Sequence, residues 1–485
     1  MKKKMVSICW LFVALTVAML AGCMVGPDYS RPKTAADTPD GYFQAGEHSQ
    51  DVNDLAYVDR WWERFGDPTT AVLVQQMLEN NYDLRAAAAR VLQAQAALVE
   101  TRGRFWPDVS YNFGIDRSKR SFKFQATRFS SLTTSYSQAI SVNYILDLFG
   151  KLRRSQQAAW ADMLAAEANE QALINSMIAT VIKSRVDIAT IQRRLAIARA
   201  NTESREKTLE IVERRYGQGL VGPVDVRLAR ENLAASKAVE PVIELSLIMA
   251  RHALDVLLGR RPGASENLPE TLADLPNLEP VPIGLPASLL DRRPDVKAAE
   301  SALWAANEKI GVSIARLYPD LTLTANVGRN ADRWRDIWKS QTETYFAFLG
   351  LAQPIFKGGQ LRAQVDAAEA RYAELAANYA GTVLTAMQEA EDALVGEQML
   401  QTQFKHTRVR LREAKAAESL SRQRYQRGVE GILAVLESER RSRMSEEELT
   451  ILKGRLWTTR VNLFLALGGD WDYQEQFEEQ VALRK

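Results

Sequence analysis

The sequence predicts a mainly α-helical protein with a small β part, built from two copies of one structural unit. Two stretches dominated by helix formers, 151–258 and 361–467, each have the pattern of two very long helices joined by a glycine-containing turn. The two stretches overlay at one fixed offset of 209 positions, which brings Tyr216 onto Tyr425 and Arg153 onto Arg362. Segments with alternating apolar and polar residues precede each stretch. These observations indicate an internal duplication.

Composition narrows the class of protein. The chain has 485 residues, 46% of them hydrophobic and 25% charged, which is typical of a folded protein of two or three domains. The formal net charge is only +2. No dense basic stripe interleaved with exposed aromatic residues occurs, so we expect no nucleic-acid partner.

The amino terminus has the form of a secretory signal peptide. Three lysines at positions 2–4 precede an apolar run at 5–20 and then small residues. This apolar run is too short to be kept as a membrane-spanning helix. We expect residues 1–22 to be removed and the protein to leave the cytoplasm.

The tetrapeptide LAGC at 20–23 resembles the lipobox of bacterial lipoproteins, in which the cysteine becomes the acylated first residue. Cys9 leaves with the signal peptide, so Cys23 is the one thiol of the mature chain and no disulfide is expected. A chance cysteine after an ordinary signal peptide is the alternative. Met24 in place of Asp after the cysteine is similar to the outer-membrane sorting pattern.

The mature chain begins with an extended segment and continues into the first copy. Residues 23–66, rich in proline and glycine, are expected to form a lipid-anchored strap over the surface. The first copy, 67–259, opens with a helix that begins at Asp67 and Pro68 and stops near Pro107.

A two-residue period then predicts β-hairpins at about 108–147 and, in the second copy, at about 320–355. The strands are expected at 108–117 and 136–147, with a polar, basic loop between them. In the second copy the loop holds Trp334 and Trp338. The alternation by itself is also compatible with a half-buried sheet of a soluble domain.

Strands of about ten residues can span a bilayer only in a closed barrel, and four strands cannot close one. Eight strands leave an interior that side chains fill. The chain is therefore expected to oligomerise. Three chains, a homotrimer with a twelve-stranded transmembrane β-barrel and four strands per chain, are the smallest set that leaves a lumen.

The long helices define the rest of the chain. The helix at 151–216 would extend roughly 100 Å, too long for a globular domain. A coiled-coil rod is the simple alternative, but Ala-rich faces favour close sideways packing with neighbouring helices. Pro241 is expected to interrupt the fourth helix. The expected boundaries are long helical hairpins at 150–258 and 360–467, a Pro-rich linker at 260–294, a second copy at 295–468 and a tail at 469–485.

Nothing in the sequence predicts an enzyme. The three histidines, His48, His252 and His406, lie far apart and lack metal-ligand spacing. Gly217, Gly219 and Gly222 match GxGxxG, but they follow a long helix rather than a strand, so we interpret them as turn glycines. We expect no catalytic residue, no metal and no cofactor.

With these elements assembled, the chain resembles the outer-membrane factor family, the TolC-like and OprM-like exit ducts of tripartite efflux systems driven by RND-type transporters. The motifs that carry the resemblance are CMVGPDYSRP at 23–32, FWPD at 105–108, LYPD at 317–320, DLFGKLR at 147–153, PIFKGGQLR at 354–362, RRYGQG at 214–219 and QRYQRG at 423–428. The first motif places the chain with the lipidated, OprM-like branch. The resemblance implies a trimeric duct in the outer membrane with a helical barrel that extends through the periplasm.

The resemblance also implies functional residues. A periplasmic gate would consist of Leu433, Glu437 and Arg440, with Glu437 replacing the usual Asp. A ring of three carboxylates would attract cations, and the arginine could tie it to a neighbouring helix. The alternative is a solvated charge pair on one helix. The turns that hold Gly219, Gly222, Gly428 and Gly431 would contact a periplasmic adaptor, also called a membrane fusion protein.

The expected function is passive conduction of small molecules, drugs or other toxic compounds, from an inner-membrane transporter and its adaptor to the outside. A duct for a protein secretion system and a duct for metal-cation efflux remain alternatives. A structural lipoprotein coiled coil is disfavoured because it would lack the alternating strands.

Overall fold

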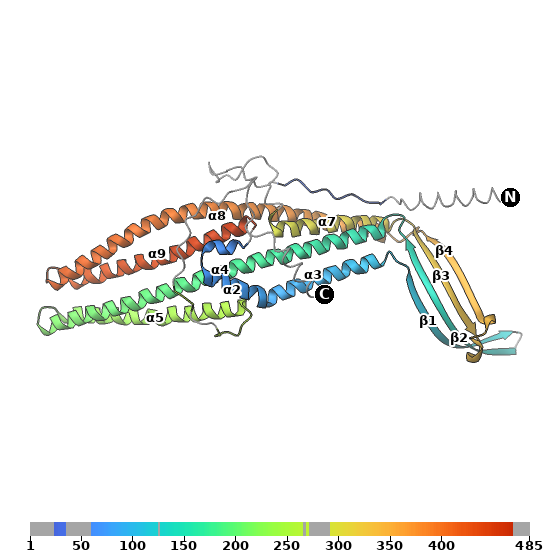
Figure 1. Ribbon diagram of the computed structural model, residues 1–485, viewed down its shortest axis with the longest axis horizontal. Helices are drawn as coiled ribbons and strands as arrows, with labels where there is room; N and C mark the ends of the chain where they lie inside the picture. Colours follow the sequence, from blue (N-terminus) through green and yellow to red (C-terminus); the bar gives the residue numbers. More distant parts are fainter. Residues whose placement is uncertain (1–23, 35–59, 125–126, 265–267, 271–291, 469–485) are drawn as a thin grey trace. The chain divides into compact units, whose positions relative to one another are not determined.

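A computed structural model describes residues 24–34, 60–124, 127–264, 268–270 and 292–468 (Figure 1). Several predicted features lie outside the described residues: Cys23, the predicted signal peptide, His48, most of the predicted strap, the centre of the predicted linker and the predicted tail. The chain divides into two compact units. The sheet unit comprises Met1–Pro32, Ala89–Glu167 and Ala298–Ala380, and the helical unit comprises Lys33–Ala88, Ala168–Lys297 and Gly381–Lys485. Each unit thus combines segments of both sequence copies.

The duplication is visible in the bounds of the helices. The first long hairpin is α4 (Lys151–Gly217) with α5 (Pro223–Leu257), and the second is α8 (Gln360–Gln426) with α9 (Ile432–Ala466). All four bounds of the second pair follow those of the first at the same offset of 209 positions (360 minus 151). The predicted internal repeat is confirmed.

The helices before the β-hairpins correspond as well. These are α3 (Tyr82–Gly103) and α7 (Pro294–Ala315), which lie 212 positions apart (294 minus 82). The offset falls from 212 before the β-hairpins to 209 after them. The first hairpin region is therefore three residues longer than the second.

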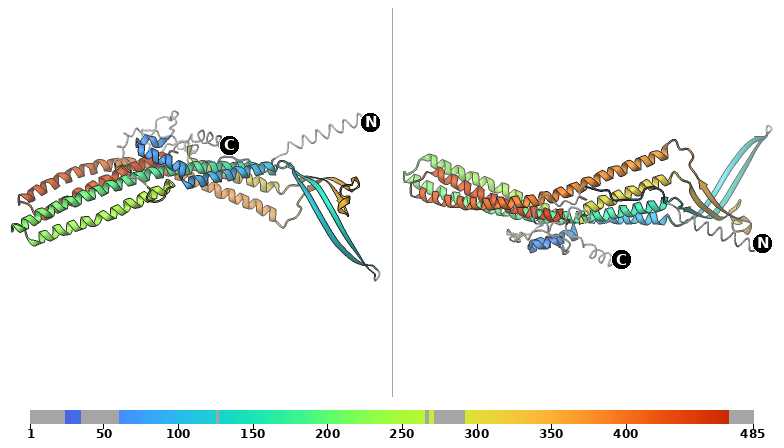
Figure 2. Two further views of the ribbon diagram at one scale, coloured as in Figure 1. Left: turned by 60° about the horizontal axis from the view of Figure 1, so that its bottom comes forward. Right: turned by 90° about the horizontal axis from the view of Figure 1, so that it is seen from above.

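The sheet unit contains an antiparallel sheet in the order β1-β2-β3-β4 (Figure 1), which Figure 2 shows from two further directions. Its strands are β1 (Asp108–Phe124), β2 (Thr127–Leu146), β3 (Asp320–Ala331) and β4 (Glu343–Ala352). Short 3-10 helices, η4 (Trp334–Asp336) and η5 (Ser340–Thr342), lie between β3 and β4. Strands from both sequence copies thus join in one sheet, through the pairing of β2 with β3.

The two faces of the sheet differ in polarity. One face carries apolar side chains that lie in register from strand to strand, namely Tyr111, Ile140, Val327 and Tyr345. The opposite face carries Asn112, Ser141 and Asn326, and both asparagine side-chain amides donate to the Ser141 hydroxyl, at 3.2 and 2.9 Å. This alternation is the predicted one.

The first β-hairpin is longer than expected. The polar, basic loop predicted between 117 and 136 is wrong, because β1 continues to Phe124 and β2 begins at Thr127. Arg117 pairs with Thr134 and Lys119 with Leu132, as in any antiparallel ladder. Backbone pairing requires only a partner strand, so polar residues on both faces do not end it.

The first predicted helix is two helices. α2 (Pro68–Asn80) begins as expected at Asp67, whose carboxylate accepts from the Thr69 amide at 3.2 Å. The chain then leaves the helical conformation at Asn81. The Asn81 side chain accepts from the amides of Asp83 and Leu84 and so caps α3.

Pro241 lies inside α5, which continues through it. The predicted interruption is therefore wrong. A proline removes one backbone hydrogen bond. Buried side chains before and after it, Ser236, Ile243 and Leu247, hold the helix against its neighbours and offset that loss.

The helical unit has its main core where the 3-10 helix η3 (Trp61–Phe65) meets the long helices. Trp61 stacks on Phe464, and Phe65 packs against Trp457. The close approach of α4 and α9 favours a glycine at this point, because a Cβ on Gly454 would lie 2.6 Å from Thr190 Oγ1 and would force that side chain to move. These contacts join both long hairpins to the segment that precedes α2.

In the sheet unit, the described part of the strap docks on a buried ion pair. The guanidinium of Arg154 donates to Glu308 at 2.8 Å and to Asp28 at 2.9 Å, and both Arg154 and Glu308 are almost fully buried. It also donates to the carbonyl oxygens of Val25 and Gly26. Residues that follow the predicted acylated cysteine are thus held by a charge in the interior.

Candidate functional site: the tips of the helical hairpins

The turns at the tips of the two long hairpins, α4–α5 and α8–α9 (Figure 1), share one pattern of backbone hydrogen bonds. In the first, the Leu220 amide donates to the Arg215 carbonyl at 3.0 Å. In the second, the Val429 amide donates to the Arg424 carbonyl at 3.1 Å, again 209 positions on. This bond, which closes six residues, is the Schellman motif that ends many α-helices.

The glycines of these turns have two different roles. Gly219 and Gly428 have φ of 71° and 78°, a left-handed conformation that favours glycine. Gly222 and Gly431 have φ of −86° and −85° and begin the returning helices, so their backbone suits any residue. The interpretation of the GxGxxG match as a turn agrees with this geometry for Gly219.

Within the helical unit the two tips are in contact. A small apolar cluster contains Val212, Val226, Tyr425 and Val435, contributed by α4, α5, α8 and α9. The Arg215 guanidinium lies 4.8 Å from the centre of the Tyr425 ring and donates to the Tyr425 carbonyl. Burial raises the pKa of the Tyr425 phenol. The duplicate residue Tyr216 is 48% exposed, so only the second tyrosine packs between the hairpins.

The predicted gate residues lie on the first turns of α9. Leu433 is 66% exposed. Arg440 donates to Glu437 through Nε and Nη2, both at 2.8 Å, and Arg441 donates to Glu437 at 2.6 Å. Hydrogen bonds from Arg440 and then Arg441 lower the pKa of Glu437 to about 2. Within one chain, Glu437 is thus an ionised group paired along its own helix, and its role in a gate stays a prediction.

A stronger polar contact next to the predicted gate was missed by the sequence analysis. The buried carboxylate of Glu439 accepts from Thr208 on α4 at 2.9 Å and from Arg422 on α8 at 2.8 Å. Its second oxygen is buried without a hydrogen-bond partner among the described residues. Glu439 therefore links both hairpins close to their tips.

The offset of 209 positions could have revealed this pair. It maps Arg422 onto Glu213 and Glu439 onto Arg230, and Glu213 and Arg230 also form an ion pair, at 2.7 Å. Each hairpin thus has an ion pair at this position across its two helices, with the signs exchanged between the copies. When the two copies are overlaid, an oppositely charged pair occurs at the same two positions in each, with the signs reversed. This pattern is a signal for contact that the sequence alone contains.

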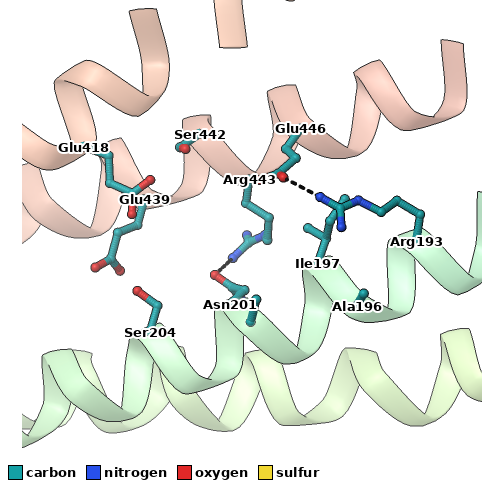
Figure 3. Close-up of a pocket in the computed structure, with 11 residues that line it drawn as sticks. Arg193, Ala196, Ile197, Asn201, Ser204, Glu418, Glu439, Ser442, Arg443 and Glu446 are labelled. Carbon is teal, nitrogen blue, oxygen red and sulfur yellow. Dashed lines mark hydrogen bonds and ion pairs between the residues drawn. The ribbon is translucent and has the colours of Figure 1, made fainter. Parts of the chain in front are cut away.

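Glu439 borders a cavity of about 180 Å³ (Figure 3). Figure 3 shows α4 on one side and α8 and α9 on the other, with Arg443 bonded to Asn201 at 2.8 Å and Arg193 paired with Glu446 at 3.2 Å. Burial lowers the pKa of Arg443. Polar and charged side chains therefore form most of the lining between the hairpins at this level, and Ala196, Ile197 and Ala200 complete it.

Other predicted features contribute no site in the part of the chain that the structure describes. His252 lies on α5 and His406 on α8. Among the described residues, no group of three or more His, Cys, Asp or Glu side chains could hold a metal ion. No helix among these residues is long and apolar enough to span a membrane.

The chain combines a sheet that has one apolar and one polar face with two long helical hairpins that end in glycine turns. This combination is typical of proteins that form a channel. Residues 73–260 and 285–469 match the family described as outer membrane efflux protein. The chain belongs to this family, and the two matched stretches correspond to its two copies. It is therefore an outer-membrane component of an efflux system.

Curated relatives and solved structures agree. The chain is 30% identical to the pyoverdine export outer membrane protein OpmQ of Pseudomonas aeruginosa, over 94% of this chain and 96% of that protein. It is also 30% identical to the toluene efflux pump outer membrane protein TtgF of Pseudomonas putida, over 96% and 97%. The structure is similar to the outer-membrane channel OprN, with a TM-score of 0.85, 30% identity and coverage of 93% and 100%. A second neighbour, VceC of Vibrio cholerae, has a TM-score of 0.79, 28% identity and coverage of 86% and 100%.

Proposed function

We propose that three copies of this chain form one duct through the outer membrane and conduct small molecules passively to the outside. The observation that carries the proposal is the open four-stranded sheet. β1 and β4 are its outer strands. Among the described residues, neither has a second strand paired with its outer edge, so both edges are available to strands of other chains. Edge-to-edge pairing of three such sheets closes a twelve-stranded barrel without exposed edges.

The dimensions and polarity of the sheet support this assembly. β3 has 12 residues and β4 has 10, which is the length that a tilted strand needs to cross a bilayer. The apolar face of the sheet suits contact with lipid, and the polar face suits a water-filled interior. Trp334 packs against Phe113 and Tyr136 near one end of the apolar face, where barrels commonly carry aromatic residues.

The partners follow from membership of the family. We propose that a periplasmic adaptor contacts the hairpin turns and that an inner-membrane RND-type transporter supplies the cargo. Acylation of Cys23 would add a lipid anchor, and the docked residues 24–31 would hold that anchor beside the sheet unit. The names of three relatives refer to pyoverdine export, toluene efflux and solvent efflux, which favours small-molecule cargo over secreted proteins.

Reconstitution of the full chain tests the function. The purified protein is expected to form a heat-resistant trimer and to produce discrete ion conductance in planar lipid bilayers. Expression together with a cognate adaptor and transporter should restore drug resistance to a strain that lacks its own duct. A protein that stays monomeric and leaves lipid vesicles impermeable would contradict the proposal.

The gate provides a second test. Glu437→Ala removes the carboxylate that Arg440 and Arg441 share, and Arg440→Ala leaves Glu437 with one cationic partner. Either change is expected to loosen the closed end and raise single-channel conductance, because a narrow charged ring limits the current. Arg412→Ala, at an exposed pair on α8, serves as a control of unchanged conductance. If neither gate variant differs from wild type, the assignment of the gate is wrong.

A further inference from the structure

Two phenyl rings interrupt the polar face of the sheet. Ser110, Ser141 and Asn326 lie in one row across β1, β2 and β3, and the row ends at Phe346 on β4. The next row runs from Asp108 through Asn143 and Thr324 to Phe348. In both rows three polar residues are followed by one phenylalanine.

The rings are accessible on this face. Phe346 is 54% exposed and Phe348 is 60% exposed. Gly350, two residues further on the same face, leaves room for the second ring, because a Cβ there would lie 2.7 Å from Phe348 Cε1. The Phe348 ring thus lies along the strand, and the contact of the two rings with water is unfavourable unless an apolar group covers them.

Neither lipid nor a second chain would cover these rings in the closed barrel. Lipid contacts the apolar face, and successive residues of a strand point to opposite faces. A neighbouring copy that pairs with β4 lies beside it in the plane of the sheet, about 4.8 Å away, so its side chains contact the sides of the rings and leave the surface that faces the interior of the barrel open. The remaining occupant is a solute inside the duct.

We propose that Phe346 and Phe348 form a contact site for aromatic solutes on the inner wall of the barrel, an inference that rests on the duct function proposed above. Aromatic rings prefer offset-stacked or edge-to-face pairs, and each such pair adds affinity beyond the burial of area. The site would hold aromatic cargo weakly and briefly, as passage requires.

The test uses the full-length channel in planar bilayers with two permanent cations as probes, benzyltrimethylammonium and ethyltrimethylammonium. Both carry the same charged group, and only the first has a ring. In the wild-type channel, the concentration of benzyltrimethylammonium that halves the KCl current is expected to be about two- to tenfold lower than that of ethyltrimethylammonium. One or two ring contacts account for a difference of this size.

Phe346→Ser combined with Phe348→Ser should remove this preference, since serine is common on the polar face. Asn326→Ser, in the same row, is the matched control and should keep the preference. Phe346→Leu with Phe348→Leu keeps apolar side chains that suit the strand and should also reduce the preference, so a folding defect of the serine variant leaves the proposal testable.

Equal preference for the benzyl compound in wild type and both double variants would overturn the proposal, while KCl conduction itself would still support the duct. A wild-type protein that conducts no KCl would defeat the duct and this contact site together.

Discussion

Leucine in place of Gly219 or Gly428 is expected to abolish efflux while trimers still assemble. A side chain at Gly219 would have nothing within 4 Å, and one at Gly428 would meet only the flexible end of Arg215, at 3.5 Å. The new side chain would therefore project from the tip, where we propose that the adaptor binds. The positive φ adds strain of about 1–3 kcal/mol, which is local to the turn.

Two further variants separate loss of adaptor contact from backbone strain. Gly219→Ala has the same strain without bulk and should retain efflux. Gly222→Leu has bulk without strain, because its φ is −86° and nothing lies within 4 Å, and it should lose efflux. The measurements are drug resistance and the amount of trimer in the membrane. Equal loss in Gly219→Ala and Gly219→Leu, with normal efflux in Gly222→Leu, would assign the effect to the turn rather than to a partner.

Arg154→Met is expected to have the largest effect on stability, about 3–5 kcal/mol, because it leaves the Glu308 carboxylate buried without its cation. The same change releases the Val25 and Gly26 carbonyl oxygens and Asp28 from the guanidinium. We expect little assembled protein in the outer membrane and a lower temperature of thermal unfolding for what remains.

Lys309→Met is the matched control. Lys309 pairs with Asp162 at 2.8 Å between the same two helices, α7 and α4, but both side chains are about half exposed. An exposed pair contributes about 0–1 kcal/mol, so this variant should be close to wild type. Adding Glu308→Leu to Arg154→Met should recover part of the stability by removing the unpaired charge. Similar unfolding temperatures for the two single variants would show that the buried pair contributes no more than the exposed one.

The features that could be predicted from the sequence are those that depend on short stretches of residues. The duplication, the long helices, the alternating strands and the glycine turns all depend on the order of residues within short stretches, such as the left-handed conformation required at Gly219 and Gly428. The predicted fold class and location in the outer membrane were confirmed. Cys23 lies outside the described residues, so its acylation stays a prediction.

The predictions were wrong where the propensity of a stretch of sequence competed with a specific hydrogen-bonding partner. Asn81 sits in a continuous helical pattern, yet its side chain caps the next helix instead. Residues 118–123 lack an apolar face, yet they form a strand because a partner strand is present. Propensity describes a residue and its neighbours, and in both cases a specific hydrogen-bonding partner outweighed it.

By itself, the sequence determined the kind and order of the elements, their repetition and the turns that reverse the chain, since periodicity and backbone conformation are local properties. Only the tertiary structure decided that Tyr425 is buried and its equivalent, Tyr216, is exposed. It also decided that Glu439 accepts a hydrogen bond from Thr208, which lies 231 positions away. Contacts between distant segments depend on how whole helices pack, because the two copies share a pattern but occupy different surroundings.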